Sequence, residues 1–230
     1  MTRAWLSSVI RRARSRGVES QDDVHDLWRG AFGQKYIARN DSPELLQAER
    51  IFFQRALQGH SEIQSVLEFG ANIGNNLAVI GERFPRARMA AVEINPAACG
   101  ELRRRMPLVE VVQCEIESFE STQKFDLVLC KGVLIHQHPS SLPLIYKKLA
   151  RAAARDVLLC EYFSAQPVSL RYRGVAGGIW KRDFAAEFLE VCSDFVLEDY
   201  GFVYHLDFRA QFDNFNWFLL RRRKAELASG

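Results

Sequence analysis

The stretch VLEFGANIG at residues 66–74 joins an apolar run to a carboxylate and then to two glycines around an asparagine. Glu68 would bring a charge to the end of a strand. The turn from Gly70 to Gly74 would leave backbone groups accessible to a ligand, because glycine permits close approach. Such a turn either contacts a nucleotide-like ligand or is an ordinary strand-to-helix connection.

Two more carboxylates follow the next apolar runs of the chain. Glu93 ends the run in AAVEIN, and Glu115 follows the run in VVQCEIE. A carboxylate at the end of the second strand can accept hydrogen bonds from both hydroxyls of a ribose. We therefore expect Glu93 and its neighbour Ile94 to contact a ribose, and Glu115 and Ile116 to bracket an adenine.

Two nucleotide-type ligands must then be distinguished. An NAD enzyme needs glycines at the first, third and sixth positions of the turn, where this chain has Gly70, Asn72 and Asn75. The charge of Glu68 would also repel a pyrophosphate and attract a cation. S-adenosylmethionine carries an ammonium and a sulfonium and no phosphate. The sequence therefore favours S-adenosylmethionine, with Gly70, Asn72, Gly74 and Asn75 among its contacts.

The elements that must position these groups alternate between strands and helices. Runs rich in Val, Ile, Leu or Phe predict strands near 64–69, 89–94, 109–114, 125–131 and 156–162. Helical stretches are expected at 75–84, 96–106 and 140–154. Alternation of this kind gives parallel strands joined by right-handed crossovers, with helices on both faces.

The last third of the chain differs from this pattern. A helix near 183–191 is followed by the runs Phe195–Tyr204 and Phe215–Leu220, which predict an antiparallel pair. The predicted fold class is therefore α/β. It is a Rossmann-like, doubly wound, mostly parallel seven-stranded sheet with an antiparallel C-terminal strand and an N-terminal helical cap.

Helix signals also define the expected division of the chain. Residues 42–59 form a helix pattern in which Ser42 can act as the cap and Pro43 suits the first turn. We expect a basic tail or helix over 1–20, the helical cap over 21–60, and the S-adenosylmethionine-binding domain over 61–225. Ligands of such sheets bind at the carboxyl ends of the strands, where the residues above converge.

Residues after the fourth and fifth strands are the candidates for catalysis. Lys131 and Gly132 end the fourth strand, where Gly132 permits close approach of the sulfur. His136 follows at the mouth of the expected cleft and is the leading candidate for a general base. Glu161 and Tyr162 end the fifth strand and are expected to face the same cleft.

Polar loop residues are expected to recognise the methyl acceptor. They comprise one histidine near the sixth strand and a group in a substrate-covering insertion near 163–183: His205, Tyr172, Arg173, Lys181 and Arg182. The cations of this insertion alternate with glycines, so they can pair with an anion as the segment closes. A solvated basic loop is the alternative.

The composition limits the class of partner. The chain of 230 residues is long enough for one α/β domain with a full core. Residues 1–20 hold five arginines against Glu19, whereas the remainder is nearly neutral, which disfavours a nucleic-acid substrate. No apolar run approaches the ~20 residues of a membrane span. Since the five cysteines include no CxxC pair, we expect reduced cysteines, no metal site and a cytoplasmic protein.

The motif ExGxNxG at Glu68–Gly74, the acidic Glu93 and the strand Asp126–Lys131 resemble class I S-adenosylmethionine-dependent methyltransferases. A longer set of motifs resembles the methylase family associated with pseudaminic acid biosynthesis. This set is Trp28 with FGQKYIARN (32–40), LEFGANIGNN (67–76), VEIN (92–95), KGVLIHQHP (131–139), CEYF (160–163), YRG (172–174), KRDF (181–184) and DYGFVYHLD (199–207). The likeness departs at Ser164-Ala165-Gln166, where an Asn-Pro-Thr-type sequence is expected.

This resemblance implies an enzyme that transfers a methyl group from S-adenosylmethionine to a small molecule, such as a sugar, a nonulosonate or another anionic metabolite. It also implies that the N-terminal segment covers the cofactor, with Tyr36 beside it and Arg39 reaching the methionine carboxylate. An RNA or protein methyltransferase and a non-catalytic cofactor-binding module are the alternatives. Oxygen or nitrogen methylation is expected, but the sequence leaves open the acceptor atom (oxygen, nitrogen or carbon) and the oligomeric state.

Overall fold

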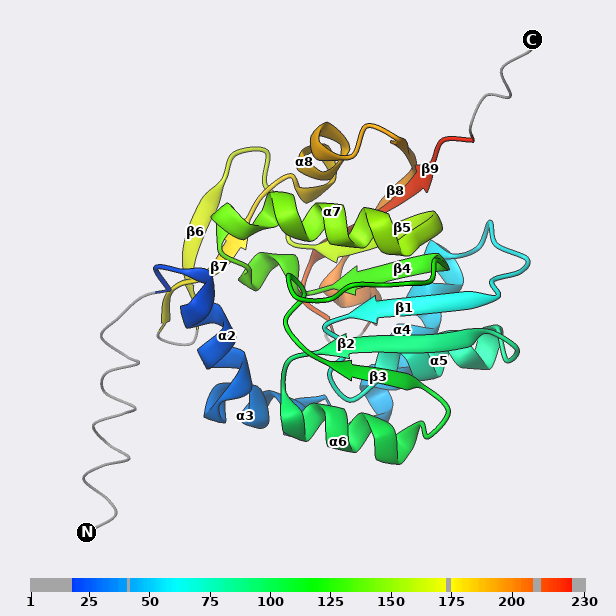
Figure 1. Ribbon diagram of the computed structural model, residues 1–230, viewed down its shortest axis with the longest axis horizontal. Helices are drawn as coiled ribbons and strands as arrows, with labels where there is room; N and C mark the ends of the chain where they lie inside the picture. Colours follow the sequence, from blue (N-terminus) through cyan, green and yellow to red (C-terminus); the bar gives the residue numbers. More distant parts are fainter. Residues whose placement is uncertain (1–17, 41, 173–174, 209–211, 225–230) are drawn as a thin grey trace.

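The computed structural model describes residues 18–40, 42–172, 175–208 and 212–224, without the side chains of Ala38, Arg39 and Phe208. The basic segment expected over residues 1–20 therefore lies outside the described residues, apart from 18–20. Figure 1 shows a central sheet with helices on both faces.

Seven strands form the central sheet, in the order β3-β2-β1-β4-β5-β9-β8. All neighbouring pairs from β3 to β5 are parallel, and β9 runs antiparallel to both β5 and β8. This confirms the predicted doubly wound sheet with an antiparallel strand near its C-terminal side. The strands are β1 (Ser65–Phe69), β2 (Arg88–Glu93), β3 (Glu110–Gln113), β4 (Phe125–Lys131), β5 (Ala153–Glu161), β8 (Phe195–Val203) and β9 (Phe215–Arg222).

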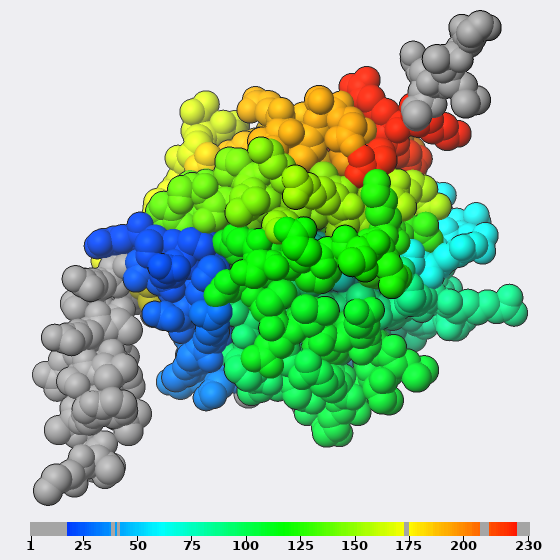
Figure 2. All heavy atoms as spheres, in the orientation of Figure 1, coloured from blue at the N-terminus to red at the C-terminus, as the bar shows by residue number. Residues whose placement is uncertain are grey.

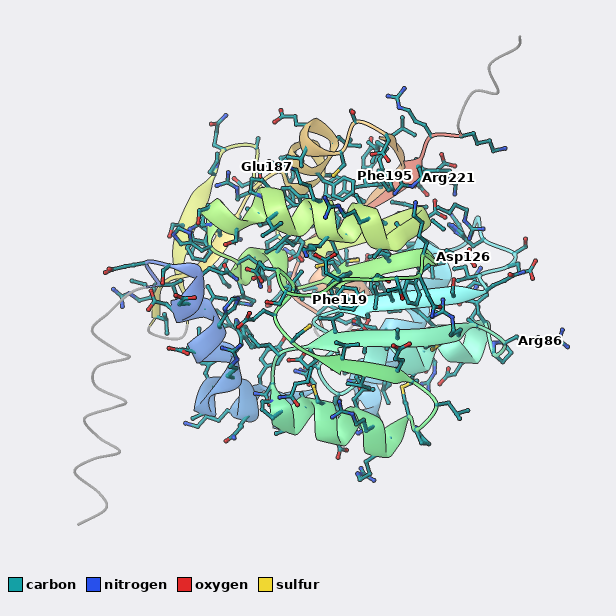
Figure 3. The ribbon with its side chains drawn as sticks, viewed as in Figure 1. Arg86, Phe119, Asp126, Glu187, Phe195 and Arg221 are labelled. Atoms are coloured by element: carbon teal, nitrogen blue, oxygen red, sulfur yellow. The ribbon has the colours of Figure 1, made fainter. Side chains whose placement is uncertain are left out.

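The chain order reverses between β1 and β4, because β2 and β3 lie on one side of β1 while β4 and β5 lie on the other. At the amino ends of these two strands, Asp126 Oδ2 accepts hydrogen bonds from the main-chain N–H groups of Gln64 and Ser65, at 2.7 and 3.1 Å. Figure 3 shows Asp126 at this end of the sheet. The opposite, carboxyl ends are where a doubly wound sheet binds its ligand.

Helices cover both faces and bury the strands between two cores. Side chains of α4 (Pro43–Ala56), α5 (Asn75–Arg83) and α6 (Pro96–Arg105) pack in one core, including Phe52, Leu77 and Leu102. Side chains of α7 (Leu142–Ala152) and α8 (Phe184–Val191) pack in the other. Burial on both faces explains why the parallel strands are continuous apolar runs.

Side-chain caps set where the helices begin. Ser42 accepts from the N–H of Leu45 at the start of α4, and Asn95 accepts from the N–H groups of Ala97 and Ala98 at the start of α6. Each cap satisfies N–H groups that a helix leaves without internal partners. The helix predicted over 42–59 begins as expected and ends at Ala56.

Two helices and a hairpin lie beside the carboxyl ends of the strands (Figure 1). The helices are α2 (Gln21–Arg29) and α3 (Ala31–Arg39), and the hairpin is β6 (Val168–Tyr172) with β7 (Val175–Lys181). In Figure 2 the blue atoms of α2 and α3 lie directly against the green atoms of the sheet domain. The sequence predicted an insertion at the hairpin but not its strands. Four of the five residues of β6 are exposed, and the sequence analysis did not use the alternation of apolar and polar residues in its sequence Val-Ser-Leu-Arg-Tyr.

Short 3₁₀ helices form parts of the connections between these elements. They are η1 (Leu134–His136) and η2 (Pro139–Ser141) after β4, and η3 (His205–Phe208) after β8.

Arg83 of α5 holds the carboxyl end of α4. Its guanidinium donates to the main-chain oxygens of Gln54, Leu57 and His60 at 3.2, 2.9 and 3.1 Å. These carbonyls follow the last turn of α4 or belong to it, where a positive charge is favourable. We expect Arg83→Ala to lower the free energy of unfolding by about 1–2 kcal/mol in urea titrations. The matched control is Arg86→Ala, which removes an exposed arginine. Equal stability of the two variants would contradict this account.

Candidate active site

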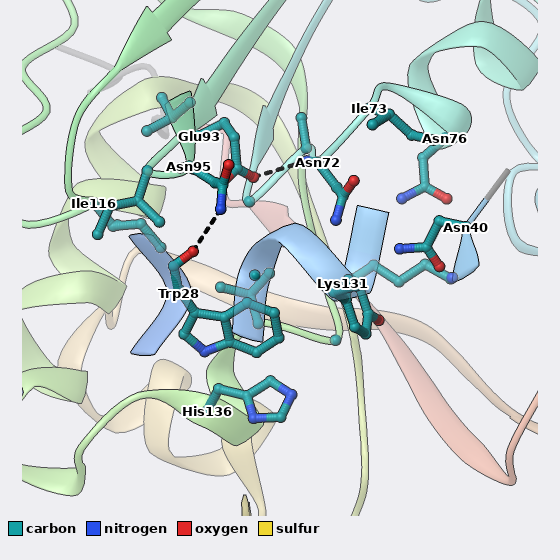
Figure 4. A pocket seen from close by; sticks show the side chains of 18 of the residues that line it. Trp28, Asn40, Asn72, Ile73, Asn76, Glu93, Asn95, Ile116, Lys131 and His136 are labelled. Atoms are coloured by element: carbon teal, nitrogen blue, oxygen red, sulfur yellow. Dashed lines mark hydrogen bonds between the residues drawn. The ribbon is translucent and has the colours of Figure 1, made fainter. Parts of the chain in front are cut away.

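A cavity lies at the carboxyl ends of β1, β2, β3 and β4, next to α2 and α3 (Figure 4). It encloses about 1050 Å³ of space between atoms, part of it open to solvent. Eleven of the residues predicted to bind or act on a ligand line it: Tyr36, Gly70, Asn72, Asn75, Glu93, Ile94, Glu115, Ile116, Lys131, Gly132 and His136.

The turn after β1 has the tight conformation that its glycines allow. Gly70 and Gly74 have φ angles of 73° and 85°, and Asn72 has φ 50°. A Cβ at Gly70 would lie 2.4 Å from Cγ2 of Val133, so a larger residue would push the turn away from the loop after β4. Gly74 itself does not line the cavity; it is the N-cap of α5. The turn is thus shaped for close packing as well as for ligand contact.

Glu93 organises the centre of the cavity. Its Oε2 accepts the N–H of Asn72 and its Oε1 accepts the N–H of Asn95, both at 2.8 Å. Burial raises the pKa of Glu93, and these main-chain hydrogen bonds oppose the increase. Each carboxylate oxygen has a second lone pair. The Glu93 carboxylate can therefore still accept hydrogen bonds from a ligand on the cavity side.

Asn95 connects this centre to α2. Its Nδ2 donates to the main-chain oxygen of Trp28 at 2.7 Å, a hydrogen bond drawn in Figure 4. A Cβ at Gly33 would lie 2.0 Å from that same oxygen, so α3 can pass here only because residue 33 is glycine. Trp28 was quoted in a motif but was not among the predicted contacts, and it lines the cavity.

Two glutamates stand at the end of the cavity near β3. Glu115 accepts hydrogen bonds from Arg29 and from Ser118 Oγ, and Ser118 and Arg29 together hold its pKa below the ordinary value. Both carboxylate oxygens of Glu117 are buried with no hydrogen-bond partner among the described residues. His25 Nε2 lies 3.4 Å from one of them. The sequence analysis missed Glu117, although the pattern Glu-Ile-Glu places it beside the predicted pair.

A buried ion pair stands at the other end. Lys131 Nζ donates to Glu49 Oε1 at 2.8 Å and lies over the rings of Phe212 and Phe215, 4.9 and 5.6 Å from their centroids. Burial lowers the pKa of Lys131, but the charge and the hydrogen bond of Glu49, with smaller effects from Cys160 and Tyr36, together outweigh burial and raise the pKa. Glu49 lies on α4 beside the apolar face of that helix. The sequence pattern therefore predicted a core helix and gave no sign that Glu49 lines a cavity.

Glu68 lies behind the cavity wall instead of lining it. Its Oε1 accepts a hydrogen bond from Asn76 Nδ2 at 2.6 Å, and Asn76 does line the cavity. Burial raises the pKa of Glu68 to about 8. Because Glu68 keeps its proton below about pH 8, the predicted attraction of its charge for a cation is absent at neutral pH, and an influence of Glu68 on a ligand would act through Asn76.

His136 is positioned by the hairpin. Its Nδ1 lies 2.8 Å from the main-chain oxygen of Gly178, an acceptor, so Nδ1 carries the hydrogen. Burial lowers the pKa of His136 to about 4. The imidazole is thus neutral at pH 7, and its Nε2 keeps a lone pair. The rings of Trp28 and Tyr172 lie 4.8 and 5.2 Å from it.

The structure does not bring Glu161 into the cavity. Its two oxygens accept the main-chain N–H groups of Val133, Leu134 and Ile135, at 2.9–3.3 Å. Burial raises its pKa to about 8. Glu161 thus clamps the loop that carries His136, a positioning role in place of the predicted catalytic one.

The other predicted site residues lie around the cavity without lining it. Tyr162 donates its hydroxyl hydrogen to Asp213 Oδ2 at 2.6 Å, and Lys181 Nζ lies 5.2 Å from the centroid of its ring. Arg182 donates to Glu187 Oε1 at 2.7 Å, which makes it part of the packing of α8. His205 contacts Asn214. Arg173 and the side chain of Arg39 lie outside the described residues.

The described part of the chain contains no helix long and apolar enough to cross a membrane. It also contains no group of three or more His, Cys, Asp or Glu side chains placed to hold a metal ion.

Residues 66–156 match the model of a family described as "Methyltransferase domain". The trans-aconitate 2-methyltransferase of Escherichia coli is 29% identical over 72 residues, which are 31% of this chain and 29% of that protein. The enzyme of that name from Methylobacterium nodulans is 28% identical over 114 residues, 49% of this chain and 44% of that protein. The chain thus spans less than half the length of these curated relatives.

Solved structures are similar over most of the chain. A 1,6-didemethyltoxoflavin-N1-methyltransferase of Burkholderia thailandensis with bound S-adenosylhomocysteine has a TM-score of 0.69 at 19% identity, covering 90% of this chain and 92% of that one. The sugar N-methyltransferase KedS8 of a Streptoalloteichus species has a TM-score of 0.61 at 18% identity, covering 85% and 94%. These likenesses confirm the predicted Rossmann-like methyltransferase fold. With the family match, they support the predicted enzyme class and S-adenosylmethionine as the cofactor.

The raised pKa of Glu68 predicts a pH dependence of stability. Between pH 4.5 and about 8 the folded protein holds a proton that an unfolded glutamate has lost. This contribution to stability is fully present below pH 4.5 and is lost as the pH rises through 8. We expect Glu68→Gln, which keeps an acceptor for Asn76 but cannot ionise, to remove part of the decline.

The measurement is a series of urea titrations of the ligand-free protein from about pH 5 to about pH 9. The slope of the unfolding free energy should be shallower in Glu68→Gln by up to about 1.4 kcal/mol per pH unit. Glu161 titrates in the same direction in both proteins, so it does not affect the comparison. Parallel curves would show that Glu68 is ionised in the folded protein.

Proposed function

We propose that the protein is an S-adenosylmethionine-dependent methyltransferase that acts on a small molecule. The observation that carries this proposal is a set of buried oxygens that belong to cavity-lining residues and have no hydrogen-bond partner among the described residues: Glu49 Oε2, Asn72 Oδ1, Asn76 Oδ1, and both oxygens of Glu117. Apart from the methionine carboxylate, the polar edge of S-adenosylmethionine offers donors, from its adenine amine, its ribose hydroxyls and its ammonium group. A pyrophosphate offers only acceptors, which would leave these oxygens unsatisfied.

The cavity residues divide along the ligand. Glu93 can accept hydrogen bonds from the ribose hydroxyls, and Ile116 and Trp28 can flank the adenine, with Glu117 as acceptor for its amine. The turn from Gly70 to Asn75 and the strand end at Lys131–Gly132 would hold the methionine part. When bound, S-adenosylmethionine supplies a methyl group already activated by its sulfonium. The protein then has to align the acceptor and exclude water.

His136 is the residue we assign to proton acceptance from a hydroxyl acceptor. Its neutral state and its Nε2 lone pair follow from burial and from the Nδ1–H hydrogen bond to Gly178. The hydrogen bonds from the loop to Glu161 fix the segment on which His136 stands.

For the acceptor, we propose a sugar, a nonulosonate-type molecule or another anionic metabolite. Support comes from the motif resemblance to the pseudaminic acid-associated methylases, and from the presence of a sugar N-methyltransferase among similar structures. Lys181 stands at the end of β7 with its Nζ over the ring of Tyr162. The charge of this lysine supports the proposal that the acceptor is anionic. Arg182 no longer supports it, because its Nε donates to Glu187.

The cofactor assignment predicts the behaviour of Glu93→Ala. Loss of charge-assisted hydrogen bonds to the ribose should weaken S-adenosylhomocysteine binding by about 1.5–3 kcal/mol, or roughly ten- to 150-fold. Calorimetry on wild type and variant measures this, and a thermal melt of each checks that both are folded. Failure of the wild type to bind would overturn the proposed cofactor. Equal affinities would remove Glu93 from the site.

The acceptor assignment predicts the behaviour of His136→Ala. Methyl transfer from labelled S-adenosylmethionine to nonulosonates and nucleotide sugars should fall about 10²-fold in turnover, with S-adenosylhomocysteine affinity preserved. The acceptor's amide, tested beside the acid on the wild type, reports on the anion. Normal turnover in the variant would make His136 structural. An amide methylated as well as the acid would refute an anionic acceptor.

A further inference from the structure

Glu49 has a carboxylate oxygen to which the assignments above give no hydrogen-bond partner. It stands on α4, is 3% exposed, and lines the cavity. Lys131 donates to its Oε1, while its Oε2 is buried and has no hydrogen-bond partner among the described residues. A buried carboxylate oxygen without a donor is costly, and native structures rarely keep one without a reason.

Lys131 favours the charged form of Glu49 but leaves one of its oxygens without a donor. The Nζ of Lys131 contacts the Glu49 carboxylate and lies over the rings of Phe212 and Phe215. Burial raises the pKa of Glu49, and the charge and hydrogen bond of Lys131 oppose this increase. One buried oxygen of a residue that lines the cavity is thus left without a donor, and a donor from a ligand would satisfy it.

The surroundings of Glu49 show what kind of donor fits. Glu49, Glu93 and Lys131 all lie close enough to Glu68 to influence its charge. Because Glu68 keeps its proton below about pH 8, Glu49 and Glu93 are the two neighbouring carboxyl groups that can carry a negative charge near Lys131. Asn72 and Asn76 add two more buried oxygens that lack partners among the described residues. The positions left open by these residues are all acceptors.

We propose that Glu49 binds the α-ammonium group of the methionine part of S-adenosylmethionine, with Lys131 favouring the charged form of Glu49. This inference rests on the proposed function and adds a residue that selects the amino-acid end of the cofactor. An ammonium group has three N–H donors and one positive charge. It can meet Glu49 Oε2 and the oxygen of an asparagine that lines the cavity together, and its positive charge strengthens the hydrogen bond to the carboxylate. A neutral hydroxyl would satisfy one oxygen without this charge assistance.

The test compares two ligands that share adenine, ribose and a thioether sulfur. S-adenosylhomocysteine carries the ammonium group, and 5′-methylthioadenosine lacks the amino-acid part. We expect Glu49→Gln to weaken S-adenosylhomocysteine roughly ten- to 150-fold in calorimetry and to leave 5′-methylthioadenosine within about twofold of wild type. Glu44→Gln makes the same chemical change at an exposed position of α4 and is the matched control. It should change neither affinity.

The outcomes separate this inference from the proposed function. A wild type that binds neither ligand would overturn the proposed cofactor. A wild type that binds both, with Glu49→Gln unchanged, would overturn only the role of Glu49. Equal weakening of the two ligands in Glu49→Gln would also overturn it, because Glu49 would then be acting through the shape of the cavity.

A second measurement covers the case in which Glu49→Gln does not fold. The wild type is titrated with an S-adenosylhomocysteine analogue in which hydrogen replaces the α-amino group. The proposal expects this analogue to bind at least about tenfold more weakly than S-adenosylhomocysteine. Equal binding would show that the cavity does not recognise the ammonium group, and Glu49 would lose its assigned role.

Discussion

Four carboxyl groups buried at one edge of the sheet are the constraint on which the rest of the site depends: Glu49, Glu68, Glu93 and Glu161. A carboxyl group taken out of water needs donors from the protein, or it destabilises the fold. Three of these groups form hydrogen bonds with different segments. Glu93 holds the turn after β1, Glu161 holds the loop after β4, and Lys131 approaches Glu49. The carboxyl groups buried beside the cavity therefore also hold the surrounding loops in place.

Much of the fold could be predicted because its strands are apolar runs separated by helical patterns. The positions of β1, β4 and β9 follow from those runs, and Ser42 marked the start of α4 correctly. The hairpin β6–β7 was not predicted. The sequence Val-Ser-Leu-Arg-Tyr of β6 does alternate apolar and polar residues, but it is a short run, and its partner strand β7 contains Gly177 and Gly178, which are unfavourable in strands.

The candidate site was predictable to the extent that it lies at strand ends. Carboxyl ends of parallel strands meet at one edge, so Glu93, Glu115 and Lys131 could be grouped from the sequence alone. Glu49 and Trp28 could not, because helices bring them to the cavity from outside the sheet. For one residue, position at a strand end suggested a role in the cavity that the structure does not support. Glu161 ends β5 as predicted, but three main-chain N–H groups occupy its carboxylate.

His136 contacts both the β6–β7 hairpin and α2, two elements that are proposed to lie beside different ligands. Gly178 of the hairpin fixes which nitrogen of His136 carries the hydrogen, so the lone pair on Nε2 depends on the hairpin being in place. Trp28 of α2, whose carbonyl is held by Asn95 beside Glu93, contacts the same imidazole. Tyr172 of the hairpin lies on it as well. The hairpin proposed to cover the acceptor and the helix proposed to cover the cofactor thus meet at one side chain. A shift of either element would alter the orientation or the burial of the imidazole. Burial is what keeps its pKa near 4 and the ring neutral. The proposed proton acceptor therefore depends on contacts from both the hairpin and α2.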